Sequence, residues 1–169
     1  MTQRNYNYSK HLVHPVTLIS VSDGKNENVA TMSWVCSVSS NPPLLMVAIS
    51  PNRYSHDLVL GAGEFAILVL SIHHLELATL AGTKSGKTTI KWDLPQFKKV
   101  RKEAQFIKAP LLTGCRAALE CRLVDHHAAG DHTIFIGEIV GSDYNPDVQP
   151  LILFNRRYFE PGQFIADYP

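Results

Sequence analysis

The chain has 169 residues, 45% of them hydrophobic and 18% charged, with a formal net charge of +1. This length and composition predict one folded domain over residues 1–169, or at most two small ones, with a core of its own. The densest basic cluster, Lys98–Lys102, is too short for a nucleic-acid footprint. No apolar run approaches the ~20 residues that span a bilayer, and the first residues lack an apolar signal core. We therefore expect a cytoplasmic protein.

The first half of the chain predicts short strands that alternate with helices. Strands are predicted over 15–21, 28–37, 44–49 and 64–70. The third strand is almost continuously apolar, which predicts burial on both of its faces. A short helix is predicted over 55–60, with Ser55 as its N-cap and Gly61 or Gly63 at its end. A second helix is expected over 75–81, ending at Gly82, then a polar loop over 83–89 and a short charged helix within 95–105.

The second half of the chain predicts a long antiparallel hairpin. Two strands, over 112–127 and 132–140, alternate apolar and polar residues around the turn 128–131. A last short strand is expected over 151–154, followed by a tail at 156–159. Many short strands with few helices predict a mainly β fold with helical insertions, arranged as a small β-barrel.

The cysteines and histidines give no pattern of a metal site. Cys36, Cys115 and Cys121 are odd in number and match no zinc spacing, so we expect free packing thiols. Cys115 and Cys121 would share one face of a regular strand. The paired histidines at 73–74 and 126–127 would point to different faces, without a Cys or carboxylate at ligand spacing. No metal is therefore expected.

The run Ala81–Thr88 resembles a loosened Walker A loop. A true P-loop follows a buried strand and opens a long helix. Here a helical pattern precedes the run and Pro95 limits any helix after it, which argues against nucleotide hydrolysis. The loop could still hold an anion through backbone N–H groups at Gly82 and Gly86 and the nearby lysines; a plain surface loop is the alternative.

The segment Arg53–Ser55 opens the first predicted helix. Unpaired N–H groups and the positive dipole end of a helix suit a phosphate, and Arg53 adds a forked donor. An ordinary cap beside a solvent-exposed arginine explains the same residues equally well.

The strand that leads to Trp34 carries more polar residues than a plain core strand needs. Alternation places Asn28, Met32 and Trp34 on one face, with Thr31 and Ser33 on the other. Such a strand could offer apolar contact and hydrogen bonds to a flat aromatic ring. A barrel strand with a core tryptophan is the alternative.

Taken in order, these motifs resemble the flavin reductase-like family of FMN-binding split barrels, which includes flavoredoxins. The resemblance extends from about residue 15 to residue 158, and two positions depart from the family pattern, at Ile90 and near Leu68. The matching segments are Asn28–Trp34, Ser39–Pro43, Arg53–Ser55, Gly63–Phe65, Ser85–Gly86 with Lys91–Trp92, Ala109–Pro110, Leu119–Cys121, and Gly130–His132 with Gly137–Glu138.

The resemblance implies a Greek-key split barrel that forms a homodimer and binds FMN near the subunit interface. The implied residues fall into three groups around the flavin: the ring and ribityl chain, the phosphate, and the catalytic face. The ring and ribityl chain would be lined by Asn28, Thr31, Met32, Ser33 and Trp34. The phosphate would be bound by Arg53, Ser55 and Lys91, with the loop residues Ser85 and Gly86. The catalytic face would hold His132, with Tyr158 or Phe164 closing over the ring.

The implied chemistry is hydride transfer from NAD(P)H to FMN, whose electrons then pass to free flavin, a ferric chelate or a partner protein such as an oxygenase. His132 is expected to orient nicotinamide or to supply a proton, given its near-neutral intrinsic pKa. Because the chain lacks a dinucleotide-binding glycine motif, NAD(P)H is expected to bind transiently on the exposed flavin face. The alternative is a flavoredoxin-like electron carrier that does not oxidise NAD(P)H directly.

Overall fold

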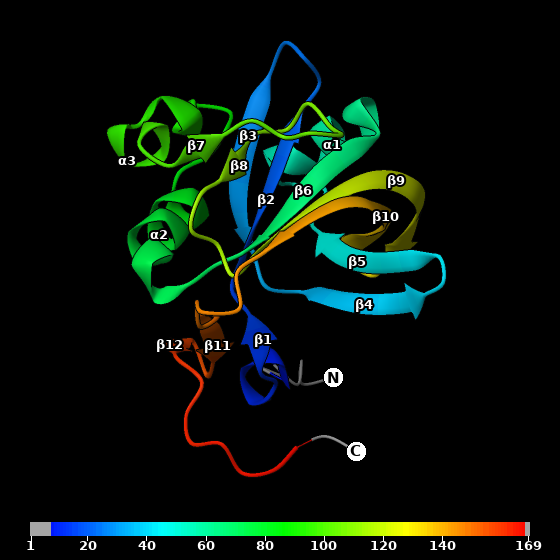
Figure 1. Cartoon of the computed structure of the whole chain (residues 1–169). Helices are drawn as coiled ribbons and strands as arrows, with labels where there is room; N and C mark the ends of the chain where they lie inside the picture. Colours follow the sequence, from blue (N-terminus) through cyan, green and yellow to red (C-terminus); the bar gives the residue numbers. More distant parts are fainter. Residues whose placement is uncertain (1–7, 168–169) are drawn as a thin grey trace, which may run out of the picture.

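The computed structural model describes residues 8–167, and its centre is one antiparallel sheet (Figure 1). The strand order in this seven-stranded sheet is β3-β2-β6-β9-β10-β5-β4. Its strands are β2 (Thr17–Ser22), β3 (Glu27–Met32), β4 (Val35–Ser40), β5 (Pro43–Ile49), β6 (Glu64–Val69), β9 (Ala117–Ala129) and β10 (His132–Tyr144). The expectation of a mainly β fold with a few helices is therefore confirmed.

Smaller elements surround this sheet. A three-stranded sheet has the order β1-β11-β12, and β7 pairs with β8. These strands are β1 (His14–Pro15), β7 (Arg101–Lys102), β8 (Leu111–Leu112), β11 (Ile152–Phe154) and β12 (Arg157–Phe159). The helices are α1 (Tyr54–Ala62), α2 (Leu75–Thr83) and α3 (Pro95–Lys98), with 3₁₀ turns η1 (Tyr8–His11), η2 (Ile72–His74) and η3 (Lys91–Asp93).

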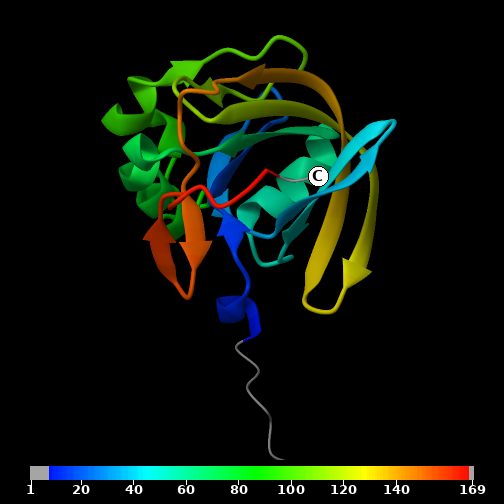
Figure 2. The ribbon, with the colours of Figure 1, turned by 60° about the horizontal axis from the view of Figure 1, so that its bottom comes forward.

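The two edges of the main sheet are joined by only two residues. β3 and β4 stand at opposite ends of the strand order, yet only Ser33 and Trp34 separate them in the chain. The sheet must therefore curl until its edges approach each other at this point, and the curvature is visible in Figure 2. The prediction of one strand over 28–37 is wrong, because the chain leaves one edge at Met32 and joins the other at Val35.

The curled sheet is apolar on both faces where it is deepest. β2 is buried at all six positions, and neighbouring residues alternate between two cores. Leu18 and Leu68 pack toward α2, η3 and α3, whereas Ile19, Ile67 and Phe65 pack toward α1, β5 and β10. Helices therefore cover opposite faces of the sheet (Figure 1).

The N-cap of helix α1 lies two residues earlier than predicted. Arg53, with extended φ and ψ, occupies the N-cap position and makes no side-chain cap bond. The prediction of Ser55 as N-cap is wrong, since Ser55 lies inside the first turn and is buried. Gly63 ends the helix in the left-handed conformation (φ 68°), and its N–H donates to the carbonyl of Val59. Glycine adopts this conformation without strain, which explains the stop.

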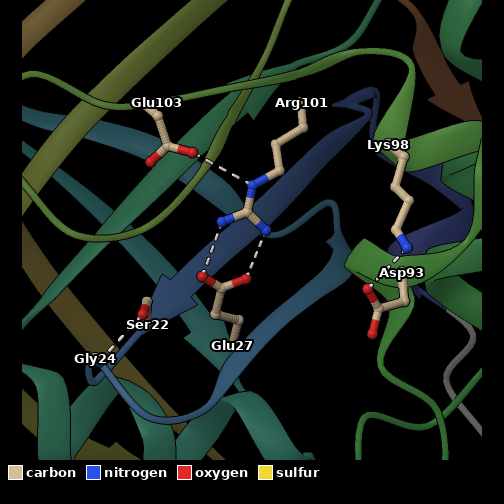
Figure 3. A network of polar contacts seen from close by, with 7 residues as sticks. All are labelled: Ser22, Gly24, Glu27, Asp93, Lys98, Arg101 and Glu103. Atoms are coloured by element: carbon tan, nitrogen blue, oxygen red, sulfur yellow. Dashed lines mark hydrogen bonds and ion pairs between the residues drawn. The ribbon is translucent and has the colours of Figure 1, made fainter.

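Three other element predictions need correction. α2 runs on through Gly82 to Thr83. The short charged helix expected within 95–105 is present as α3, and the chain then extends as β7, where Arg101 is held by Glu27 (Figure 3). The first long strand begins at Ala117, so Cys115 precedes it and does not share a strand face with Cys121. The expected tail at 156–159 forms β12.

The three cysteines are free, as predicted. Cys115 and Cys121 are buried, and burial raises the pKa of each thiol to about 12. A thiol with so high a pKa is poorly nucleophilic at neutral pH, so both act as packing residues.

β5 is buried on one face only, contrary to the prediction of burial on both. Leu45, Val47 and Ile49 are buried, whereas Met46 and Ala48 are only partly covered. Met46 and Ala48 instead line an apolar surface groove of about 380 Å³ together with Leu12, Val13, Val35 and neighbouring residues. The apolar sequence of β5 thus leaves a hydrophobic strip at the surface.

Across residues 8–167, the helices are all too short or too polar to cross a membrane. The expectation that the first residues of the chain carry no signal segment concerns residues outside the described part.

Candidate flavin site

A cavity of about 150 Å³ opens where four segments meet. Strand β3 forms one wall, the start of α1 and the end of α2 form two others, and the loop from Lys84 to Lys91 closes the fourth. Of the predicted residues it gathers Asn28, Thr31, Met32, Arg53, Ser55, Ser85, Gly86 and Lys91. Residues up to 63 positions apart in the sequence, from 28 to 91, therefore surround one space.

Lys91 is the most unusual residue of this cavity. Its side chain is 2% exposed, and its Nζ donates to the carbonyls of Lys84 (3.1 Å) and Ala81 (3.5 Å). Within residues 8–167 no carboxylate pairs with it. Burial, together with the nearby Arg53 charge, lowers the pKa of Lys91 to about 8. An anion in the cavity would offset both the cost of burying the charged lysine and its repulsion by Arg53.

Asn28 and Ser55 form a buried pair between β3 and α1. The Nδ2 of Asn28 donates to the Oγ of Ser55 at 2.8 Å. The Oδ1 of Asn28 is buried at the cavity wall without a partner among the described residues. Buried polar atoms normally have hydrogen-bond partners, so this oxygen suits a ligand donor. Ser55, predicted to cap the helix, instead positions Asn28 while remaining in the helix's first turn.

The first turn of α1 adds backbone donors. The initial N–H groups of an α-helix have no partner inside the helix and carry partial positive charge. Arg53 and Ser55 line the cavity at this end, beside Asn52 and Tyr54. The predicted anion-binding character of this segment therefore coincides with the position of Lys91.

The loop that resembled a Walker motif packs tightly onto β3 and α1. A Cβ added at Gly86 would overlap Asn28 Oδ1 and the ring of Tyr54. Only glycine permits so close an approach without displacement. Helix α2, rather than a buried strand, precedes the loop, so its anchoring differs from a P-loop. The loop nevertheless lines the cavity through Ser85 and Gly86.

Thr31 faces α2 from the free edge of β3. Its Oγ1 donates to the carbonyl of Ala78 at 2.6 Å, and a Cβ added at Gly82 would contact the Thr31 side chain. Thr31 thus lines the cavity while its hydroxyl proton ties the strand to the helix. Any hydrogen bond donated from this strand edge to the ring of a bound ligand would have to come from a group other than the Thr31 hydroxyl.

A second cavity, of about 410 Å³, continues from the first. The two share Thr31, Met32, Asn52 and Arg53. Its far wall holds Trp34 and His132, whose rings lie 4.6 Å apart at an interplanar angle of 40°. His132 Nδ1 lies 2.6 Å from Asp131 Oδ1, and this hydrogen bond lowers the pKa of Asp131. His132, predicted to lie beside the ring, therefore shares one cavity with Ser33 and Trp34.

Two predicted residues lie elsewhere. Tyr158 in β12 and Phe164 beyond it are exposed, and neither lines the two cavities. Sequence reasoning missed Asn52 and Tyr54, which line the first cavity. The signal that could have found them is their position: Asn52 lies just before the start of α1, and Tyr54 lies in its first turn.

Within residues 8–167, no three His, Cys, Asp or Glu side chains cluster in a way that could hold a metal.

Comparison with known proteins assigns the fold to a family. Residues 9–162 match the flavin reductase like domain, and the chain belongs to this family. It is 40% identical over 124 residues to an uncharacterized protein of Archaeoglobus fulgidus, covering 73% of this chain and 69% of that one. It is 35% identical over 124 residues to the FMN reductase (NADH) RutF of Agrobacterium fabrum, covering 73% and 68%. The resemblance inferred from the sequence is therefore confirmed.

A solved structure agrees with this assignment. The FMN-binding protein from Thermus thermophilus, crystallised with p-hydroxybenzaldehyde, superposes with a TM-score of 0.82 at 25% identity. The match covers 92% of this chain and 91% of that one.

Proposed function

We propose that this chain is an NAD(P)H:flavin oxidoreductase that holds FMN in the two joined cavities. The observation that carries the proposal is the position of Lys91 and Arg53. Two cationic side chains border one partly open cavity, and no described carboxylate neutralises either of them. A phosphate monoester, with two negative charges and several acceptor oxygens, fits this space.

The residues present fit FMN in three respects. Lys91, Arg53 and the first turn of α1 would bind the phosphate. The unpartnered Oδ1 of Asn28 would accept a hydrogen bond from a ribityl hydroxyl. Met32, Ser33 and Trp34 lie along the second cavity, where apolar and polar groups alternate. Ser85 and Gly86 would close the loop over the phosphate end.

The reaction follows from what surrounds the second cavity. Bound FMN supplies a ring that accepts a hydride from nicotinamide. Trp34 and His132 form one wall of this cavity, and their ring contact fixes the imidazole plane. Asp131 holds His132 at Nδ1, which leaves Nε2 to orient a carboxamide or to exchange a proton. Reduced flavin would then serve free flavin, a ferric chelate or a partner oxygenase.

The test is an anaerobic titration with purified protein. We expect FMN to bind more tightly than riboflavin, and NADH or NADPH to bleach the bound flavin rapidly. Equal affinity for FMN and riboflavin would exclude the phosphate assignment. Bleaching by reduced ferredoxin but by neither nicotinamide would replace the reductase by an electron carrier of the flavoredoxin type.

We also propose that the chain forms a homodimer through the outward face of β4 and β5. The support is the apolar groove beside Met46 and Ala48, bordered by Leu12 and Val13, which are 51% and 65% exposed. A strip of this kind on a soluble protein favours a protein interface. Tyr158 and Phe164 could then cover the flavin of the partner. Met46→Lys should convert the dimer to a monomer in sedimentation experiments; an unchanged mass would contradict this interface.

Further proposals concern the domain organisation, the barrel topology, the cellular location and the metal independence of the reaction. We propose a single domain over the whole chain whose curled sheet is a Greek-key split barrel, supported by the two-residue link between its edges. We also propose a cytoplasmic location, supported by three free thiols, which are typical of a reducing compartment. A metal-independent reaction is proposed as well, with the flavin as the redox centre.

A further inference from the structure

His56 is a buried polar residue that the proposed flavin site does not use. It lies in the first turn of α1, is 9% exposed, and lines neither of the two cavities. Its ring packs against the edge of the Phe135 ring, with the two centres 5.3 Å apart. An apolar side chain could fill such a place without needing hydrogen-bond partners, so the histidine points to a role beyond packing.

Both ring nitrogens of His56 have hydrogen-bond partners. Nδ1 lies 2.8 Å from Asp57 Oδ1, and Nε2 lies 2.9 Å from Thr133 Oγ1. An ionised carboxylate can only accept, so Nδ1 of the neutral imidazole carries the proton and Nε2 accepts from the Thr133 hydroxyl. Asp57 thereby selects the tautomer that receives this bond. The two bonds together hold the ring in one orientation.

Thr133 is the buried residue nearest to the tip of the β9–β10 hairpin. Its exposed fraction is 8%, whereas every residue over 124–131 is exposed. Its backbone pairs with Ile49 of β5 and with Ala128 of β9. The neighbouring residue, His132, is the first of β10. The position of the His132 backbone therefore depends on how Thr133 is anchored.

His56 is also tied to the proposed phosphate end of the site. Its backbone N–H donates to the carbonyl of Arg53 at 3.0 Å, and Arg53 is the N-cap of α1. Arg53 and His132 both line the second cavity. His56 thus connects, from outside this cavity, the residue proposed to bind the phosphate with the strand start that carries the proposed catalytic residue.

We propose that His56 is a positioning residue. Through Thr133, it sets where His132 stands relative to a flavin whose phosphate is held at Arg53. This inference rests on the proposed function. A misplacement of about 1 Å can lower the rate of a reaction step about 100-fold, so a small shift of His132 has a measurable effect. Because His56 lines neither cavity, its loss affects flavin reduction and leaves FMN affinity unchanged.

The first test is a matched pair of substitutions at Thr133. Thr133→Val removes the hydroxyl but keeps the branched shape of the side chain, whereas Thr133→Ser keeps the hydroxyl. In anaerobic stopped-flow experiments with saturating NADH or NADPH, Thr133→Val should slow FMN reduction about fivefold, the effect of one lost hydrogen bond. Thr133→Ser should stay within about twofold of the wild-type rate, and both variants should bind FMN within about twofold of the wild-type affinity.

Asp57→Ala tests the other end of the chain of hydrogen bonds. The Asp57 side chain is 87% exposed, so this variant gives a folded protein even if a core variant unfolds. Loss of the carboxylate frees the His56 tautomer, so reduction should be slowed more than about twofold with FMN affinity unchanged. A wild-type reduction rate in Asp57→Ala would refute the positioning role.

A double-mutant cycle with His132→Ala separates positioning from packing. If Thr133 acts through His132, Thr133→Val should change the reduction rate less than about twofold once His132 is absent. An equal loss of rate with and without His132, or a matching loss of FMN affinity, would reduce Thr133 to a packing residue and refute the proposal. If neither Thr133→Val nor Asp57→Ala slows reduction, the inference fails while the proposed function stands. If nicotinamide does not reduce FMN on the wild-type protein, both fail.

Discussion

Lys91→Met isolates the charge that the proposed phosphate site depends on. Methionine keeps most of the buried length of the lysine side chain but removes the ammonium. The substitution also removes the two hydrogen bonds to the carbonyls of Ala81 and Lys84. Flavin binding should therefore weaken while the ligand-free stability does not fall.

The magnitudes follow from the pKa of Lys91. A change of one pKa unit corresponds to about 1.4 kcal/mol. Folding lowers the pKa of Lys91 from 10.5 to about 8, so keeping this lysine charged reduces the free energy of unfolding by about 3 kcal/mol. Solvent screening reduces this cost, and losing the two hydrogen bonds offsets about 1 kcal/mol each. The ligand-free variant should thus match or exceed the wild-type stability at neutral pH. A lost charge-assisted bond of about 1.5–3 kcal/mol weakens FMN binding roughly 10- to 100-fold.

Two measurements check this reasoning. Urea unfolding of the ligand-free proteins gives the stability change, and fluorescence titrations give the affinities for FMN and riboflavin. Riboflavin affinity should stay within about twofold, since it has no phosphate. Lys87→Met, on the same loop but exposed and outside the cavity, serves as the matched control. A variant that loses FMN and riboflavin equally would refute the phosphate assignment.

The pH dependence gives a second check on Lys91. Its folded pKa of about 8 lies below the unfolded value of 10.5, so between these values the unfolded chain binds more protons. Ligand-free stability should therefore rise with pH in this window. FMN affinity should fall as pH rises above about 8, because the phosphate needs the charged lysine. Both trends should disappear in Lys91→Met. If either trend persists in this variant, a group other than Lys91 causes it.

Two further substitutions test the loop and the catalytic wall. Gly86→Ala should weaken the binding of every flavin at least tenfold, because the added Cβ overlaps Asn28 and Tyr54. Gly61→Ala, with nothing within 4 Å of its Cβ, is the control and should be neutral or stabilising; equal effects of the two would contradict this packing argument. His132→Ala should slow flavin reduction by NAD(P)H in stopped-flow measurements while FMN affinity changes less than twofold, and an unchanged rate would remove His132 from the reaction.

The sequence predicted the fold class and the residues around the first cavity because their signals are local. Arg53 at a helix start, glycines in a loop and alternation in a strand each follow from neighbouring residues. The family resemblance then placed them together. What local signals could not supply is how each side chain is used: Ser55 holds Asn28, and Thr31 bonds to α2.

The errors share a cause in long-range structure. Alternation continues across Ser33 and Trp34, so the sequence does not reveal that the chain changes sheet edges there. The short charged helix expected within 95–105 is present, but its end at Lys98 is not a local signal, because the Arg101–Glu27 pair, which spans 74 positions, holds the chain beyond it in an extended segment. The apolar outward face of β5 is predicted to be buried, because an apolar run in a single sequence does not distinguish a core face from an exposed one.

If Lys91 binds the flavin phosphate as proposed, the same buried cation would link flavin retention to stability. A cation at 2% exposure without a carboxylate is unfavourable for folding, and a bound phosphate would offset that cost. Ligands that bind only the folded state stabilise it by RT ln(1 + [L]/Kd), so the tighter ligand stabilises more at a given concentration. FMN should therefore raise the unfolding temperature well above the value with riboflavin at the same ligand concentration. The same phosphate contacts would favour retention of FMN between turnovers, so the charge state of Lys91 would determine whether the flavin stays as a cofactor or leaves as a product.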